Sequence, residues 1–159
     1  MINAVLSFLD ANNIKYELFR HPAVVSVEDS KNIVHIPDCC SYKSLLVKDK
    51  KSPRYFMIVL PFDKRADMRF LASYVCADKF EFASQDKLIE FLGVKRGSVS
   101  PFCFLNQSSV SVGLMLDRQI LSANRVRFHP TDNTATVALT SSDFLTCVSL
   151  MNKEIIWVN

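Results

Sequence analysis

Residues 44–60 read SLLVKDKKSPRYFMIVL, two apolar runs separated by a polar one. The runs Ser44 to Lys48 and Tyr55 to Leu60 are rich in aliphatic, β-branched and aromatic residues, which favour β-strands. Lys50 to Pro53 lie between the runs and have the composition of a turn. The stretch predicts a β-hairpin whose second strand, apolar along its whole length, is buried on both faces.

Helical and strand patterns alternate on either side of this hairpin. Apolar residues recur at helical spacing within 2–9, 68–75, 85–92 and 140–148, and strand patterns occur at 16–18, 80–82, 110–114, 126–128, 135–139 and 155–158. Ser26 with Asp29 has the form of a capping box for a short helix over about 27–33, and Ser84 and Gly93 bracket another helix. The order predicts an α+β fold, in which helices cover a mixed, mostly antiparallel sheet.

The composition is that of one soluble domain over residues 1–159. Hydrophobic residues make up 49% of the chain and charged residues 22%, which suits a single core with an ordinary surface. A net charge of +3 is too small for a polybasic nucleic-acid arm. The longest apolar stretch, residues 55–62, is interrupted by Pro61, and Asp10 breaks the apolar start that a secretory signal would need. We therefore expect a cytoplasmic protein with no membrane or DNA partner.

Neither cysteine nor histidine spacing indicates a metal site. The five cysteines contain no C-x-x-C pair, and the three histidines, His21, His35 and His129, are far apart in the sequence. We expect free thiols, no metal and no cofactor.

Glycine is scarce, with three in the chain, and one of them opens the segment Gly97-Ser98-Val99-Ser100-Pro101. A glycine and a proline that bracket small residues can align successive backbone N–H groups toward an anion or a polarised carbonyl oxygen. The same composition is also typical of a plain connecting loop.

Two other positions combine a polar side chain with an apolar strand. Lys43 directly precedes the first strand of the hairpin. Its side chain is either solvated, as most lysines are, or has its aliphatic stem enclosed by the protein and its ammonium directed into a pocket. His129, held extended before Pro130, either binds substrate or forms a structural hydrogen bond. Asn133 and Thr134 in the same turn are equally suited to stabilising it. No G-x-S-x-G motif is present, and no residue near a cysteine favours a reactive thiolate.

In combination, these segments resemble the YbaK/ProX family of aminoacyl-tRNA deacylases and prolyl-tRNA synthetase editing domains. The resemblance spans nearly the whole chain and rests on residues 21–24, 27–28, 43–49, 55–61, 82–84, 92–94, 97–102, 128–130 and 133–136.

The resemblance implies hydrolysis of the ester of a mischarged tRNA. It assigns catalysis to Lys43 and Gly97, and substrate binding to Ser98, Val99, Ser100, Pro101, His129, Asn133, Thr134 and Ala135. An aminoacyl ester is already activated, so an oxyanion site and a positioned water suffice, without a metal or a covalent nucleophile.

The branch that removes alanine from proline tRNA is the most similar one, and it makes proline tRNA and prolyl-tRNA synthetase the expected partners. Ser44 after the lysine, and Cys103 with Phe104 after the loop, depart from that branch. Deacylases for cysteinyl-, seryl- or threonyl-tRNA, and a non-catalytic module that binds tRNA or synthetase, remain alternatives. Candidate RNA-binding cations are Lys95 and Arg96 beside the loop and Lys50 and Lys51 on the hairpin.

Overall fold

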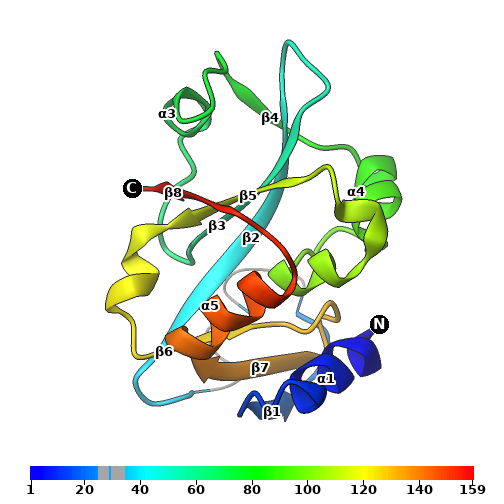
Figure 1. The fold of residues 1–159 in the computed structure, drawn as a ribbon, viewed down its shortest axis with the longest axis vertical. Helices are drawn as coiled ribbons and strands as arrows, with labels where there is room; N and C mark the ends of the chain where they lie inside the picture. The colour runs from blue at the N-terminus through cyan, green and yellow to red at the C-terminus, as the bar shows by residue number, and fades with distance from the viewer. Residues whose placement is uncertain (25–28, 30–34) are drawn as a thin grey trace.

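A mixed β-sheet forms the centre of the computed structural model, which describes residues 1–24, 29 and 35–159 (Figure 1). Its strands are β1 (Glu17–Arg20), β2 (Cys39–Asp49), β3 (Tyr55–Pro61), β4 (Phe80–Phe82), β5 (Gly113–Asp117), β6 (Arg125–Phe128), β7 (Ala135–Thr140) and β8 (Ile155–Val158). The helices are α1 (Ile2–Ala11), α3 (Met68–Ser73), α4 (Gln85–Leu92) and α5 (Ser141–Leu150), with short 3₁₀ helices at Pro101–Leu105, Gln107–Ser109 and Arg118–Ser122.

The sheet has the order β1-β7-β6-β2-β3-β5-β8, and β4 pairs with β2 beside this path. Among the described strands, four pairings are antiparallel, namely β1–β7, β6–β7, β2–β3 and β2–β4. Three are parallel, namely β2–β6, β3–β5 and β5–β8. The predicted α+β fold, one compact domain with a mixed and mostly antiparallel sheet, is confirmed, although the antiparallel majority is narrow.

Strand β2 connects the two parts of the sheet, and it is the long cyan strand of Figure 1. One of its edges pairs with β3 along residues 42–48. Its opposite edge pairs first with β6, over residues 39–41, and then with β4, over residues 47–49. Residues 42–46 lie between these two ladders, so the sheet is interrupted on that edge. The sequence predicted only the part of β2 from Ser44 onward.

Strand β3 is buried from Phe56 to Pro61, as the sequence predicted for the second strand of the hairpin. Met57 and Val59 face a core cluster formed with α1, α4, α5 and the 3₁₀ segments, whereas Ile58 and Leu60 face a cluster covered by α3. The uninterrupted apolar run thus supplies both cores, because successive side chains of a strand point to opposite faces.

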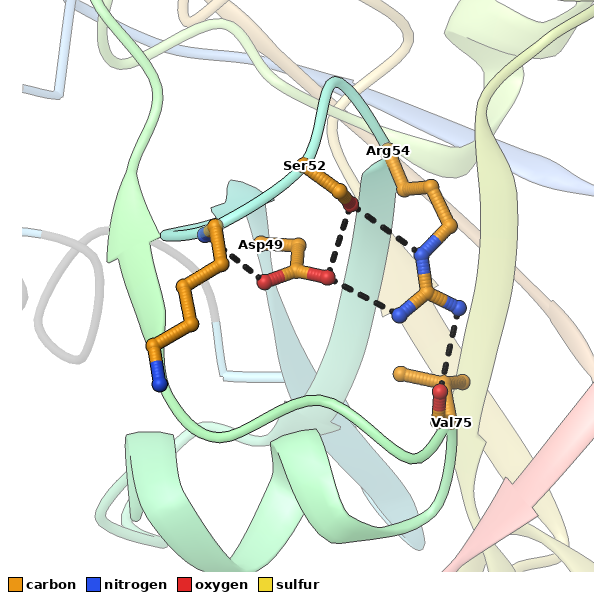
Figure 2. A network of polar contacts seen from close by, with 5 residues as sticks. Asp49, Ser52, Arg54 and Val75 are labelled. Atoms are coloured by element: carbon orange, nitrogen blue, oxygen red, sulfur yellow. Dashed lines mark hydrogen bonds and ion pairs between the residues drawn. The ribbon is translucent and has the colours of Figure 1, made fainter.

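A buried carboxylate fixes the turn of the β2–β3 hairpin (Figure 2). Asp49 accepts hydrogen bonds from the Lys51 N–H at 3.0 Å, the Ser52 hydroxyl at 2.7 Å and the Arg54 guanidinium at 2.9 Å. Arg54 also donates to the carbonyl oxygen of Val75 at 3.0 Å. These hydrogen bonds hold the pKa of the Asp49 carboxyl down at about 2, the backbone N–H of Lys51 contributing most.

The limits of α4 follow the predicted caps, and α5 begins where the sequence placed it. The Ser84 hydroxyl accepts from the Lys87 N–H, and α4 ends at Gly93 in the left-handed conformation, with φ of 69°. The Thr140 hydroxyl caps α5 by accepting from the Asp143 N–H at 3.0 Å. The predicted helix over 27–33, with its cap Ser26, lies outside the described residues.

The strand predicted over residues 110–114 is wrong in its first half. Strand β5 begins at Gly113, and Val110 is 83% exposed. The ammonium of Lys153 donates to the carbonyl oxygens of Ser109, Val110 and Val112, so a side chain rather than a neighbouring strand satisfies them. Alternating valines therefore produced a strand pattern in a segment that is a turn.

Within the described part of the chain, no helix has the length and apolar character needed to cross a membrane.

Candidate functional site

A cavity of about 530 Å³ lies beside the interrupted edge of β2. Residues of β2, the segment after β1, the turn between β6 and β7, the β4–α4 junction and the loop after α4 border it. Its lining residues are His21, Val24, Ser41, Tyr42, Lys43, Ser44, Leu45, Leu46, Phe62, Phe82, Ala83, Leu88, Arg96, Gly97, Val99, Arg127, Phe128, His129, Asn133, Ala135 and Thr136. Segments that are distant in sequence thus meet at the gap between β4 and β6, and Phe62 after β3 joins them.

Lys43 lies in the middle of this gap and is half-buried. Burial lowers the pKa of its ammonium, and the nearby negative charge of Asp63 opposes that shift. Of the two interpretations that the sequence left open, the structure therefore favours the enclosed lysine. A desolvated ammonium at a cavity wall is suited to holding an oxygen that carries or develops negative charge.

The loop after α4 brings two of its predicted residues to the cavity. Gly97 has φ of 91°, a backbone conformation that glycine adopts without strain, and Val99 is buried against the core. In the part of the chain described, no intramolecular hydrogen bond uses the N–H of Gly97 or Val99, whereas the Ser98 N–H donates to the Lys95 carbonyl oxygen at 3.0 Å. These two N–H groups, in a loop that borders the cavity, are the candidate donors for a ligand oxygen.

The other three loop residues do not line the cavity. Ser100 is buried and caps the 3₁₀ helix that begins at Pro101, its hydroxyl accepting from the Phe102 N–H at 3.3 Å. Pro101 is buried at the first position of that helix. The Ser98 carbonyl oxygen faces the Cys103 thiol at 3.9 Å. These contacts hold the loop against the 3₁₀ helix that follows it.

Two histidines line the cavity from different segments. The His21 ring bonds the Pro22 carbonyl oxygen through Nδ1 and the Thr136 hydroxyl through Nε2, both at 2.9 Å. His129 Nδ1 is buried and has no hydrogen-bond partner among the described residues. Burial lowers the pKa of His129 to about 4, a shift that nearby Asp132 opposes and His21 reinforces. His129 is therefore a neutral ring with an unused polar atom.

The turn between β6 and β7 is held by its own polar residues. Asn133 donates from its side chain to the Val24 carbonyl oxygen at 3.0 Å, and its own carbonyl oxygen accepts from the Val24 N–H. Thr134 is exposed and bonds Asp132 through both its N–H and its hydroxyl. Asn133 and Ala135 line the cavity, whereas Thr134 does not.

Of the four predicted RNA-binding cations, only Arg96 borders the cavity. Lys95 is exposed beside it. Lys50 and Lys51 lie at the hairpin turn, seven or eight residues along β2 from Lys43, which corresponds to roughly 25 Å of extended strand. Lys51 also faces Asp78 at 3.6 Å. Neither hairpin lysine lines the cavity.

Nine polar or aromatic lining residues were not predicted as site residues, namely His21, Ser41, Tyr42, Ser44, Phe62, Phe82, Arg127, Phe128 and Thr136. Arg127 of β6 donates to the Ser41 hydroxyl of β2 across the parallel ladder. Arg125 and Arg127 alternate with apolar residues, which indicates that both side chains lie on the face of the strand away from the core. The pattern does not indicate that Arg127 contacts β2. That placement depends on a pairing between segments about 85 residues apart, for which the sequence contains no local signal.

Burial raises the thiol pKa of three of the five cysteines. Cys103 and Cys147 are buried, which raises the pKa of their thiols to about 12 and about 11. Burial also raises the pKa of the Cys39 thiol. Among the described residues, no group of three His, Cys, Asp or Glu side chains could hold a metal ion. Of the residues predicted for the site, Lys43, Gly97, Val99 and His129 meet at the cavity.

Comparison with known proteins covers all of these segments. Residues 21–147 match the family described as the aminoacyl-tRNA editing domain. The chain is 32% identical over 145 residues to the prolyl-tRNA editing protein ProX of Acetoanaerobium sticklandii, covering 88% of this chain and 85% of that protein. It is 31% identical over 156 residues to prolyl-tRNA synthetase associated domain-containing protein 1 of Bos taurus, covering 95% and 90% of the two chains.

The fold is likewise similar to a solved structure. That crystal structure, provisionally described as a trans-editing enzyme for prolyl tRNA synthetase, superimposes with a TM-score of 0.67 at 16% identity, covering 97% of this chain and 93% of that chain. At this identity the similarity concerns the fold.

Proposed function

The chain belongs to the aminoacyl-tRNA editing domain family, and on that premise we propose that it is an aminoacyl-tRNA deacylase acting on mischarged proline tRNA in the cytoplasm, with alanyl-tRNA(Pro) as its main substrate. The observation that carries the proposal is the meeting of Lys43, the Gly97–Val99 backbone and His129 around one cavity. The names of the relatives, one a prolyl-tRNA editing protein and one containing a prolyl-tRNA synthetase associated domain, support that synthetase as the partner that supplies the substrate.

The reaction is the hydrolysis of one ester bond. A water oxygen attacks the acyl carbon, the bond to the ribose oxygen breaks, and that oxygen leaves with a proton as a ribose hydroxyl. The products are the free amino acid and uncharged tRNA. Because the ester is already activated, positioning of the water and stabilisation of the carbonyl oxygen account for the required rate.

In this proposal Lys43 and Gly97 act on the reacting ester. The Gly97 and Val99 N–H groups donate to the carbonyl oxygen as negative charge develops on it, and the Lys43 ammonium adds a positive charge beside it. A ribose hydroxyl of the terminal adenosine helps to position the water. Ser98, Ser100 and Pro101 serve this site by holding the loop.

The acyl group is assigned to the enclosed end of the cavity. There Val99, Phe128 and Ala135 are buried and offer apolar contact, and the neutral ring of His129 borders the same space. Asn133 and Thr134 position this wall through the turn that they stabilise. A second site of this kind is needed because a synthetase pocket distinguishes amino acids that differ by one methylene by only about 1–3 kcal/mol.

The test is hydrolysis of proline tRNA charged in turn with labelled alanine, cysteine, serine, threonine and proline. Wild type should release alanine fastest, and Lys43→Ala should lower that rate by about 100-fold or more. Lys15→Ala is the matched control, since it removes the same charge from an exposed position outside the cavity lining and should keep the wild-type rate.

The other outcomes separate the alternatives. Preferential release of cysteine, serine or threonine would retain the deacylase and replace alanine as the substrate. Absence of hydrolysis with all five, together with tRNA binding, would replace the enzyme by a binding module. A Lys43→Ala protein with the wild-type rate would remove the role given to that lysine.

A further inference from the structure

We propose that Phe82 and Arg96 form a binding site for the terminal nucleotide of the substrate, with Phe82 stacking on the base and Arg96 contacting the phosphate. We call this pair of residues the Phe82–Arg96 lip. The inference rests on the proposed function, because it takes the acyl group to lie in the enclosed part of the cavity.

Phe82 is an exposed aromatic ring at the cavity. Of the large apolar side chains that are exposed in the described part of the chain, which include Phe70, Ile89 and Leu121, only Phe82 lines the cavity, and it is 66% exposed. A phenyl ring left in water at the opening of a cavity is an available platform for a base, because every base presents a π-face to stack on.

The backbone beneath Phe82 is well fixed. Phe82 pairs with Val47 in the β2–β4 ladder, and the next residue, Ala83, is buried and donates from its N–H to the Leu46 carbonyl oxygen at 3.0 Å. Phe80, two residues earlier, is buried and packs on Phe56 with ring centroids 5.4 Å apart. Phe82 is therefore presented by a rigid strand.

Arg96 lies on the neighbouring part of the same rim. Its N–H donates at 3.0 Å to the side-chain oxygen of Gln85, which is the first residue of α4 and follows Phe82 by three positions. This bond ties the loop that carries Arg96 to the β4–α4 junction that carries Phe82. The two residues thus occupy a connected edge of the cavity, and both are exposed there.

The charge around the cavity suits a phosphate. Its lining includes the cations Lys43, Arg96 and Arg127 and, among the described residues, no aspartate or glutamate; Asp63 lies near Lys43 and Asp132 near His129. A guanidinium binds phosphate oxygens in a planar, bidentate manner, and its flat face can also stack on a base.

The order of groups in the substrate explains why a nucleotide belongs at this position. The ester joins the acyl group to the terminal ribose, so the base and phosphate of that nucleotide are the next groups outward. The cavity of about 530 Å³ is also far larger than a small acyl group needs. Single-stranded RNA ends are commonly bound by stacking on aromatic side chains together with phosphate contacts from cations.

Direct binding tests the lip without relying on hydrolysis. Adenosine and adenosine 5′-monophosphate are titrated into ¹⁵N-labelled wild type, Phe82→Ala, Phe82→Trp, Arg96→Gln and Ile89→Ala, with dissociation constants taken from amide shifts. Phe82→Ala should weaken both ligands about 5-fold or more, and Phe82→Trp should restore them. Arg96→Gln should weaken only the monophosphate. Ile89→Ala, an exposed apolar residue of α4 outside the cavity lining, should match wild type.

Kinetics distinguish a failure of the lip from a failure of the proposed function. For alanyl-tRNA(Pro), Phe82→Ala should raise KM about 5-fold or more with kcat little changed. If Phe82→Ala keeps the wild-type KM and adenosine affinity, the lip is wrong and the deacylase stands. If wild type hydrolyses no aminoacyl-tRNA, the proposed function is wrong, and the adenosine titration alone decides whether the lip binds a nucleotide.

Discussion

At the scale of single residues, His129 is the unusual group of the cavity. Its Nδ1 is buried without a partner in the described part of the chain, and burial lowers its pKa from 6.5 to about 4. A buried polar atom of this kind costs stability unless a ligand satisfies it. The ring also borders the cavity, so a neutral imidazole rather than an imidazolium faces a bound group.

The lowered pKa of His129 leads to a prediction of how the stability of the protein depends on pH. Between pH 6.5 and about pH 4 an unfolded chain protonates this histidine while the folded chain does not, so the free energy of unfolding falls as the pH decreases through this range. The loss approaches about 3 kcal/mol at most. His129→Gln removes the titration and should lose less stability than wild type between pH 7 and pH 4.5, as measured by urea unfolding.

His35→Gln provides the control for this measurement, because His35 is exposed. It should reproduce the wild-type pH dependence. If the free energy of unfolding falls equally with pH in wild type and in His129→Gln, the protonation of His129 does not contribute to the pH dependence of stability.

At the scale of elements, Gly93 and Gly97 lie on either side of the Lys95–Arg96 pair, and both have a left-handed backbone conformation. We expect their substitution to have different effects. A Cβ on Gly93, which ends α4, would lie 2.8 Å from the Asn106 side-chain nitrogen, whereas a Cβ on Gly97 would meet no heavy atom within 4 Å. Gly93→Ala combines backbone strain with a clash, and Gly97→Ala adds strain alone. We expect Gly93→Ala to reduce the free energy of unfolding more, by about 1–3 kcal/mol.

The deacylation rate should be affected in the opposite order, more by Gly97→Ala than by Gly93→Ala. Gly97→Ala alters the backbone that presents the loop donors and should lower the deacylation rate about 10-fold or more, while Gly93→Ala, assayed well below its melting temperature, should stay near wild type. Thermal melts and rates of both proteins provide the comparison. Equal effects on rate would mean that the Gly97 conformation has no special role at the ester.

The elements also show what the sequence could and could not predict. Caps such as Ser84, Gly93 and Thr140 act on neighbouring residues, so their helix limits were correct. The first half of the strand expected at 110–114 was wrong because Lys153, about forty residues later, binds the carbonyl oxygens there. The extension of β2 to Cys39 was missed because it depends on pairing with β6.

The candidate site divides in the same way. Lys43, Gly97 and His129 were predicted because each stands in a recognisable local segment, and all three border the cavity. Phe82 and Arg127 were not, because only the gap between the β4 and β6 ladders brings their short strands to one opening. Residue type indicated candidates for chemistry, whereas strand register determined which of them meet.

At the scale of the whole molecule, β2 and β3 make the two core clusters dependent on each other. Met57 and Ile58 are adjacent in β3, both fully buried, and they face different clusters. Neither cluster can lose its packing while β3 keeps its place in the sheet. The 159-residue chain should therefore unfold in one cooperative transition, despite its two cores.

Truncations on the two faces test this cooperativity. Met57→Ala and Ile58→Ala should each reduce the free energy of unfolding by about 2–5 kcal/mol, because each removes fully buried methylene or methyl groups. If the cores are coupled, each variant lowers a single melting temperature by about 5–15 °C. Calorimetric and van't Hoff enthalpies should agree in both variants. A second transition that shifts in only one of them would instead show that the α3-covered cluster unfolds on its own, and that β3 does not transmit the loss of packing between the two faces of the sheet.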